Sequence, residues 1–257
     1  MADRALFVVP GLTREIAEIA TVLDALELPV RLAAGPAAGV DELRRAFAGM
    51  RFAADPIDPF DPVRFRDELE GWSVTPRDGP TRVPIDHAFP VKGVGAVALG
   101  VVRGGPLRAH ERLRLYPEER EVEVRSVQVH DVDVTAAATG DRVGVALKGI
   151  EADELARGQV LAPAGSLTAT AHVVGSPVRR CRYYRRPLAV GDHLHLSVGL
   201  QFTPVVIEHV DTTTIALEAD RPLALAGGEP AVLADLSAGA GPRTVAGFPV
   251  TAATEHT

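Results

Sequence analysis

The chain has 257 residues, of which 46% are hydrophobic and 24% are charged, and its formal net charge is −7. This length suits one large domain or two to three small ones, and the negative charge argues against a protein that coats nucleic acid through bulk electrostatics. No apolar run approaches the roughly 20 residues of a membrane span, and the lone cysteine, Cys181, excludes an internal disulfide, so we expect a cytoplasmic protein with no membrane partner.

The N-terminal segment, residues 1–75, has the pattern of a small α/β domain. Residues 5–10 form a short continuous apolar run, which is typical of a buried parallel strand, and Thr13 is a good N-cap for a helix. Apolar residues at helical spacing follow, and a second strand is expected at residues 29–34. Two further helices are expected, with a stiff proline-rich loop between them at residues 55–62.

The pattern changes at Val83 to short strands rich in β-branched residues, separated by glycine, aspartate and proline turns at about ten-residue spacing. Because closure removes exposed strand edges, we predict two small β-barrels, at residues 82–164 and 166–250. Residues 75–81 are predicted to be a linker with few contacts. We therefore expect an α+β multidomain chain whose barrels fold without the N-terminal segment.

The two barrel segments carry an ordered set of motifs. The first contains VPIDHAFPVKGVGAVALGVVRGG, VRSVQVHD, ATGDRVGVALKGI and LARGQVLAP, and the second contains VGDHLHLSVGLQ, LEADRPLAL and AVLADLSAG. The first set resembles domain 2 of the elongation factor Tu superfamily of translational GTPases, and the second resembles domain 3. The selenocysteine-specific elongation factor and its archaeal relatives are nearest in pattern. The resemblance implies two β-barrels of translation-factor type, and residues 1–75 resemble the C-terminal half of the family's G domain.

The sequence lacks the residues with which this family binds GTP. A phosphate-binding P-loop needs GxxxxGK[ST], but the chain contains no Gly-Lys pair, and its only lysines are Lys92 and Lys148. The guanine-reading NKxD element needs an asparagine, and the chain has none. The one DxxG match, Asp141 to Gly144, is better explained as a turn that enters a barrel strand. We therefore expect a degenerate or truncated G domain, no GTP binding and no catalytic residues.

Lys92 lies beside Gly93 and Gly95 in the glycine-broken ribbon of the first barrel. Because glycine has no Cβ, backbone N–H groups there can approach phosphate or ribose closely. The resemblance implies that this face helps to hold the aminoacyl end of tRNA or rests against ribosomal RNA. These three residues are therefore candidate RNA contacts, and the alternative is that the glycines only relieve crowding at a barrel corner.

The segment VRRCRYYRR, residues 178–186, surrounds two tyrosines with arginines. Basic residues interleaved with aromatic ones can pair with phosphates and stack on exposed bases. As a strand, the segment would expose the face that carries Tyr184 and bury Cys181 and Tyr183. The alternative is a solvated strand and turn. The candidate RNA contacts in this segment are Arg179, Arg180, Arg182 and Tyr184.

These features favour a non-catalytic translation-factor-like protein whose barrels bind tRNA or ribosomal RNA. One alternative is a fragment or subunit of a GTP-dependent elongation factor, with the GTP-binding half on a partner chain or lost upstream of Met1. A further alternative is a metal-dependent hydrolase on a barrel scaffold. Its only support in the sequence is the spacing of His193 and His195, which suits two metal ligands on one side of a strand. No third ligand is evident near these histidines, so we expect no metal site there.

Overall fold

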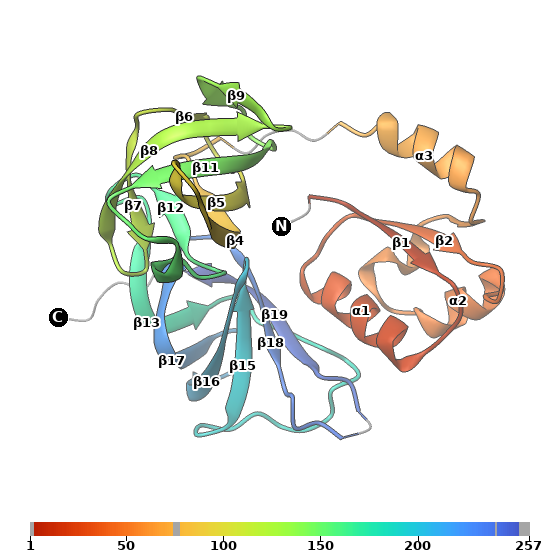
Figure 1. Cartoon of the computed structure of the whole chain (residues 1–257). Coiled ribbons are helices and arrows are strands. Elements are labelled where there is room, and N and C mark those ends of the chain that lie inside the picture. The colour runs from red at the N-terminus through yellow and green to blue at the C-terminus, as the bar shows by residue number, and fades with distance from the viewer. Residues whose placement is uncertain (1–2, 74–77, 240, 252–257) are drawn as a thin grey trace. The chain divides into compact units, whose positions relative to one another are not determined.

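The structure is a computed structural model, and it describes residues 3–73, 78–239 and 241–251 (Figure 1). By their contacts, the described residues fall into two compact units that are not contiguous in sequence. The first unit lies within residues 1–75, 178–187 and 232–248, and the second lies within residues 76–177, 188–231 and 249–257. None of the described helices is long and apolar enough to cross a membrane.

The N-terminal part of the first unit is a parallel sheet in the order β1-β2-β3, together with short helices. Its elements are β1 (Ala5–Val9), α1 (Arg14–Ala25), β2 (Val30–Ala34), α2 (Val40–Ala46), the 3-10 helix η1 (Arg51–Ala54), β3 (Ile57–Pro59) and α3 (Pro62–Glu70). Thr13 caps α1 as predicted, because its hydroxyl accepts a hydrogen bond from the N–H of Ile16 at 3.3 Å. Asp61 caps α3 in the same way.

Two local predictions had different outcomes. The prediction of a loop throughout residues 55–62 is wrong, because β3 forms within it, where Ile57 is buried and pairs in register with Leu32 of β2. The prediction of a turn at the DxxG match is confirmed. The carboxylate of Asp141 accepts a hydrogen bond from the N–H of Ala138 at 2.7 Å, just before a strand begins.

The first β-barrel is a ring of six described strands in the order β11-β5-β4-β12-β7-β8, which closes where β11 pairs with β8. These strands are β4 (Val83–Val91), β5 (Gly95–Val101), β7 (Arg112–Tyr116), β8 (Arg120–Val129), β11 (Arg142–Lys148) and β12 (Val160–Ala162). Outside the ring lie β6 (Leu107–Arg108), β9 (Val132–Val134), β10 (Ala136–Ala137) and the 3-10 helix η2 (Ala152–Glu154). Alternate residues point inward, so that Ile85, Val124 and Val145 are fully buried in one core.

The second β-barrel is a ring of six described strands in the order β13-β17-β16-β15-β18-β19, which closes where β13 pairs with β19. These strands are β13 (Thr168–Gly175), β15 (His193–Val198), β16 (Gln201–Val210), β17 (Ile215–Leu225), β18 (Pro230–Ala234) and β19 (Thr244–Thr251). The short β14 (Arg179–Arg180) pairs antiparallel with β19. Strands β18 and β19 contribute residues to both units. The predicted fold of a small α/β segment followed by two β-barrels is therefore confirmed.

The two barrels are joined within the second unit by apolar and polar contacts. The apolar contact is a cluster of Tyr116, Val160, Ala162, Leu167 and Ala224. The hydroxyl of Tyr116 accepts a hydrogen bond from the N–H of Gly165 at 2.9 Å. Arg82, at the start of the first barrel, forms an ion pair with Glu229 at 2.7 Å. Arg82 directly follows the predicted linker at residues 75–81, of which residues 75–77 lie outside the described part of the chain.

Helix α1 packs against the end of the second barrel's sheet within the first unit. A Cβ on Gly247 of β19 would lie 2.1 Å from the carbonyl oxygen of Ala25, so the close approach requires glycine. The hydroxyls of Thr21 and Thr244 form a buried hydrogen bond of 2.8 Å. The prediction that the barrels fold without the N-terminal segment did not include this packing. Removal of residues 1–75 uncovers the face of β19 around Gly247 that α1 covers.

Candidate nucleic-acid interface

Lys92 occupies the turn of the β4–β5 hairpin in the first barrel, and its side chain is exposed. The N–H of Val94 donates to the carbonyl of Val91 at 3.0 Å and closes the turn. Gly93 has a φ of +81° and Gly95 a φ of +100°, a backbone conformation that favours glycine. A Cβ on Gly93 would meet nothing within 4 Å, so the turn has an open surface. The turn requires these two glycines for their backbone conformation. The glycine that relieves crowding in this barrel is Gly100, where a Cβ would lie 2.5 Å from the carbonyl oxygen of Pro84.

Arg125 of β8 lies against the same turn and adds a second exposed cation to it. Its Nη1 donates to the carbonyl of Val94 at 2.8 Å and, more weakly, to that of Gly93 at 3.4 Å. Arg125 sits at a register shift in the pairing of β8 with β11, and such a bulge turns a side chain away from the regular direction. The sequence alone does not reveal this contact, because the alternation of residues indicates that Arg125 is exposed but not which turn it contacts.

An exposed apolar strip lies on the outer face of the same hairpin. The rings of His87 and Phe89 lie 5.8 Å apart, and Leu99 and Val97 stand opposite them on β5. Leu99 is 37% exposed, which is high for a leucine in a barrel strand. The first barrel therefore presents two cations at its turn and aromatic and apolar side chains along the hairpin, a combination that can pair with phosphate and stack on a base.

The arginine-rich segment lies in the first unit and only its first residues form a strand. Arg179 and Arg180 make up β14, whereas Arg182 and Tyr183 form a turn. The predicted alternation of faces is wrong, because the turn breaks it, and Tyr184 is the buried tyrosine, at 8% exposed. Tyr184 is therefore not available to stack on a base.

Most of the residues predicted to contact RNA in this segment contact other parts of the first unit instead. Arg179 pairs with Glu27 at 3.1 Å, and Arg182 donates to the carbonyl of Ala48 at 3.0 Å. Arg180 is exposed and donates to the carbonyl of Arg186 at 3.0 Å. The arginine segment belongs to the first unit, whereas Lys92 belongs to the second.

A buried polar network explains why Tyr184 is held inside. Its hydroxyl donates to the carboxylate of Asp235 at 2.7 Å and accepts from Nε of Arg186 at 2.9 Å. The hydroxyl and N–H of Ser237 also donate to Asp235. Burial alone would raise the pKa of Asp235, but the hydrogen bonds from Ser237 and Tyr184 lower it. Burial and the bond to Asp235 raise the pKa of Tyr184.

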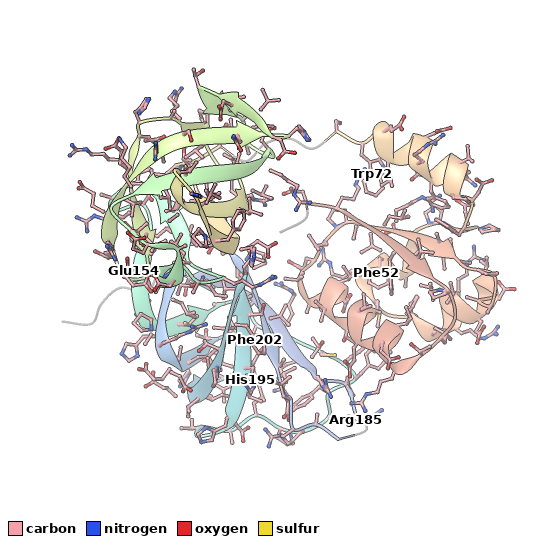
Figure 2. All side chains as sticks on the ribbon, in the orientation of Figure 1. Phe52, Trp72, Glu154, Arg185, His195 and Phe202 are labelled. Carbon is pink, nitrogen blue, oxygen red and sulfur yellow. The ribbon has the colours of Figure 1, made fainter. Side chains whose placement is uncertain are left out.

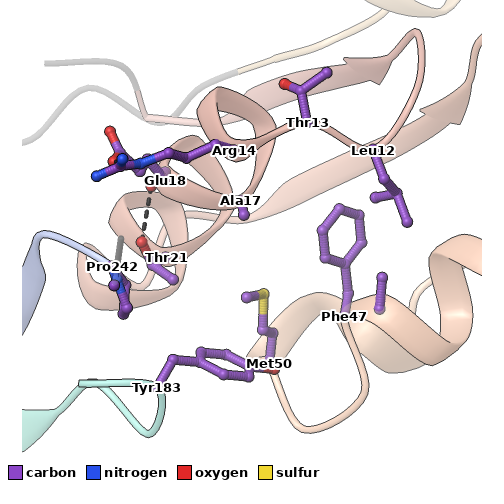
Figure 3. Close-up of a pocket in the computed structure, with 12 residues that line it drawn as sticks. Leu12, Thr13, Arg14, Ala17, Glu18, Thr21, Phe47, Met50, Tyr183 and Pro242 are labelled. Atoms are coloured by element: carbon purple, nitrogen blue, oxygen red, sulfur yellow. Dashed lines mark hydrogen bonds and ion pairs between the residues drawn. The ribbon is translucent and has the colours of Figure 1, made fainter. Parts of the chain in front are cut away.

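A cavity of about 500 Å³ lies in the first unit between α1, the end of α2 and residues 241–242 (Figure 3). Its apolar wall is formed by Leu12, Ala17, Phe47, Met50, Tyr183 and Pro242. At its rim Arg14 and Glu18 form an ion pair of 3.1 Å. The size suits a small organic molecule. Besides the apolar groups and the ion pair, the lining includes Thr13, whose hydroxyl accepts from the N–H of Ile16, and Thr21, whose hydroxyl donates to the carbonyl of Glu18.

His195 and Cys181 are held by contacts inside the second barrel's sheet and the first unit, respectively. The rings of His195 and Phe202 are stacked, with centroids 5.2 Å apart (Figure 2). Neither His193 nor His195 belongs to a group of three close metal-ligating side chains within the described part of the chain. Cys181 is half-buried, and its N–H donates to the carbonyl of Val245 at 2.8 Å, as expected of a packed residue.

Comparisons with known proteins agree with this architecture. The family model described as Elongation factor Tu domain 2 matches residues 95–162, which lie in the first barrel. An uncharacterized protein of Methanocaldococcus jannaschii is 33% identical over 241 residues, which cover 93% of this chain and 77% of that protein. The selenocysteine-specific elongation factor of the same organism is 36% identical over 126 residues, which are 49% of this chain and 27% of the relative.

Solved structures show the same fold. The apo crystal structure of translation elongation factor SelB from Methanococcus maripaludis matches 97% of this chain and 64% of its own, with a TM-score of 0.80 and 21% sequence identity. The chain thus spans less than two thirds of that factor. The chain therefore belongs to one family with the uncharacterized protein of Methanocaldococcus jannaschii, and its first barrel contains a domain of the Elongation factor Tu domain 2 family.

Proposed function

We propose that this chain is a non-catalytic translation-factor-like protein of the cytoplasm that binds tRNA or ribosomal RNA through the hairpin of its first barrel. The observation that carries the proposal is the exposed turn at Lys92, with Arg125 beside it, in a barrel of elongation factor type. A chain of net charge −7 needs such a local basic site to bind RNA, because its overall charge repels phosphate.

The arrangement of the hairpin supports contact with both phosphate and base. The two cations at the turn can pair with phosphate oxygens, and the ring of Phe89 lies on the same hairpin, where a splayed base can stack on it. The arginine segment of the first unit is a weaker candidate, since Arg179 and Arg182 are held by contacts inside the protein.

The test is RNA binding as a function of salt, with matched charge variants. Lys92→Ala should weaken binding of tRNA or ribosomal RNA and flatten the salt dependence by about one unit or less, because one phosphate contact is lost. Arg112→Ala is the control, since it removes the same charge from an exposed side chain of the same barrel that pairs with Glu121. Substitution of Gly93 or Gly95 is a poor test, because any side chain there strains the turn.

Three outcomes separate the proposal from its rivals. Loss of affinity in the Lys92 variant, with the Arg112 variant close to the parent, supports it. Equal losses in both variants mean that binding is bulk electrostatics, and no binding by the parent at low salt means that the barrel does not bind RNA. Either of the last two results contradicts the proposal.

We further propose that GTP does not bind this chain alone. The phosphate-cradling and guanine-reading motifs are missing from the sequence, so no site of the family's kind can be assembled from it. Isothermal titration with GDP should show no binding, and a micromolar dissociation constant would refute this.

A second candidate function is a subunit of a GTP-dependent factor whose GTP-binding half is on a partner chain, which is favoured by the identity of 36% to the selenocysteine-specific elongation factor. Under this alternative a tagged chain recovered from its own cell carries a GTP-crosslinking partner, whereas under the first it does not.

A further inference from the structure

The outer face of the second barrel brings together one histidine and two glutamates from three strands. His172 lies on β13, Glu208 on β16 and Glu218 on β17. His172 and Glu218 are directly paired across β13 and β17, and Val206, two residues before Glu208, is paired with Glu218 on its other side. The potential ligand atoms of the three side chains all lie within 4.8 Å of one another.

Two register shifts in the sheet contribute to this juxtaposition. The pairing of β13 with β17 shifts between Thr170 and His172, and the pairing of β16 with β17 shifts between Ile207 and His209, on either side of Glu208. Bulges of this kind re-aim side chains and occur beside functional sites. The ligating residues are thus carried by strands of a closed barrel rather than by a loop, which holds them in place.

The cluster carries negative charge with little compensation. Nδ1 of His172 lies 2.6 Å from Oε2 of Glu218 and 3.6 Å from Oε2 of Glu208. In the described part of the chain no lysine or arginine pairs with either glutamate. Oε2 of Glu218 is buried, and its 2.6 Å contact with Nδ1 of His172 lacks the geometry of a hydrogen bond. A buried carboxylate oxygen without a well-aligned donor is costly, and a cation between the three groups would satisfy it.

We propose that His172, Glu208 and Glu218 form a binding site for a divalent transition metal ion, with Zn²⁺ as the type case. Imidazole nitrogen with two carboxylates is a ligand set for borderline metals rather than for Mg²⁺ or Ca²⁺, which prefer oxygen alone. Two ligands at the usual zinc distance and tetrahedral angle are about 3.3 Å apart, so the 3.6 Å pair already fits and Glu218 must move by about 0.7 Å.

The site has an open approach and a free coordination position. The side chains of His172, Glu208 and Glu218 are 66%, 48% and 41% exposed, so an ion can enter from solvent. Three protein ligands leave a fourth position for water or for a donor atom of a partner. Because the ligands come from β13, β16 and β17, a bound ion also ties three strands of the barrel together and stabilises them by mass action.

The test uses the full chain, freed of any histidine tag and treated with a chelator. Zn²⁺ is titrated calorimetrically, and Co²⁺ is followed by its visible absorption, which reports coordination geometry. We expect one ion per chain and a rise in melting temperature with added Zn²⁺. Glu218→Gln and His172→Gln should each weaken Zn²⁺ binding by roughly tenfold or more and abolish the rise in melting temperature.

The matched control is His195→Gln, which removes another histidine from the outer face of the same barrel. This histidine stacks on Phe202 and lies outside the cluster, so Zn²⁺ binding should stay at the parent level. Circular dichroism of each variant checks that the barrel is folded. The proposal is overturned if the parent binds neither ion, if the Glu218 and His172 variants fold and bind like the parent, or if the His195 variant loses binding instead.

Discussion

Replacement of Gly247 by alanine tests the contact between α1 and the second barrel's sheet. The added Cβ would lie 2.1, 2.7 and 2.9 Å from the carbonyl oxygen, carbonyl carbon and Cα of Ala25. All three are backbone atoms, so no side chain can rotate away to make room. Either α1 or β19 must shift, and the buried hydrogen bond between Thr21 and Thr244 joins the same two elements.

The expected loss of stability follows from the cost of overpacking. An extra methyl group in a well-packed interior costs about 1 to 3 kcal/mol, and the rigid neighbours of Gly247 place this variant near 2 to 3 kcal/mol. For a unit of about 100 residues, that corresponds to a fall of roughly 10 to 20 °C in the melting temperature of the first unit.

The assay is urea unfolding followed by the fluorescence of Trp72, the single tryptophan of the chain, which lies in the first unit. Gly239→Ala is the control in the same unit, because its Cβ would meet nothing within 4 Å. Gly100→Ala strains the first barrel and should leave the tryptophan transition largely in place. An unchanged midpoint for Gly247→Ala would show that α1 does not pack on β19 as described.

Three further predictions concern the first unit. Tyr184→Phe leaves buried Asp235 without one hydrogen-bond donor and should cost about 1 to 3 kcal/mol in urea unfolding, and a neutral result would contradict the role given to the network. The pKa of Asp235 is lowered in the folded state, so the stability that its carboxylate contributes is present above about pH 4 and is lost as the pH falls through the lower folded pKa. Asp235→Asn should therefore lose less stability in acid than the parent does. Equal acid sensitivity of the two proteins would refute this. Deletion of residues 1–75 should expose apolar surface around Gly247 and increase the binding of a hydrophobic dye, whereas an unchanged dye signal with cooperative melting would mean that the barrels stand alone.

The barrels could be predicted from the sequence, because the alternation of inward and outward residues is local. The runs that became β8 and β11 show this alternation plainly, and their inward residues Val124 and Val145 are buried. The strand β3 was missed, since three residues among prolines have little strand propensity of their own. Its pairing with β2 supplies what the local sequence lacks.

The candidate site was predicted only in part, for a related reason. Lys92 is exposed at a turn as expected, but the cation beside it, Arg125, is brought there by a bulge 33 residues later in the chain. Tyr184 was expected on an exposed face, and it is buried because Asp235, 51 residues further along, accepts its hydrogen bond. Contacts between distant segments leave no trace in the periodicity of either segment.

The division of the first unit among three stretches of chain bears on how the protein is made. Residues 1–75 leave the ribosome before the residues that complete the first unit, and the face of α1 that meets Gly247 is covered only after residue 248 has been synthesised. At ordinary elongation rates this interval is roughly ten to thirty seconds. During that time the N-terminal segment has an uncovered apolar surface, to which chaperones that bind nascent chains can attach.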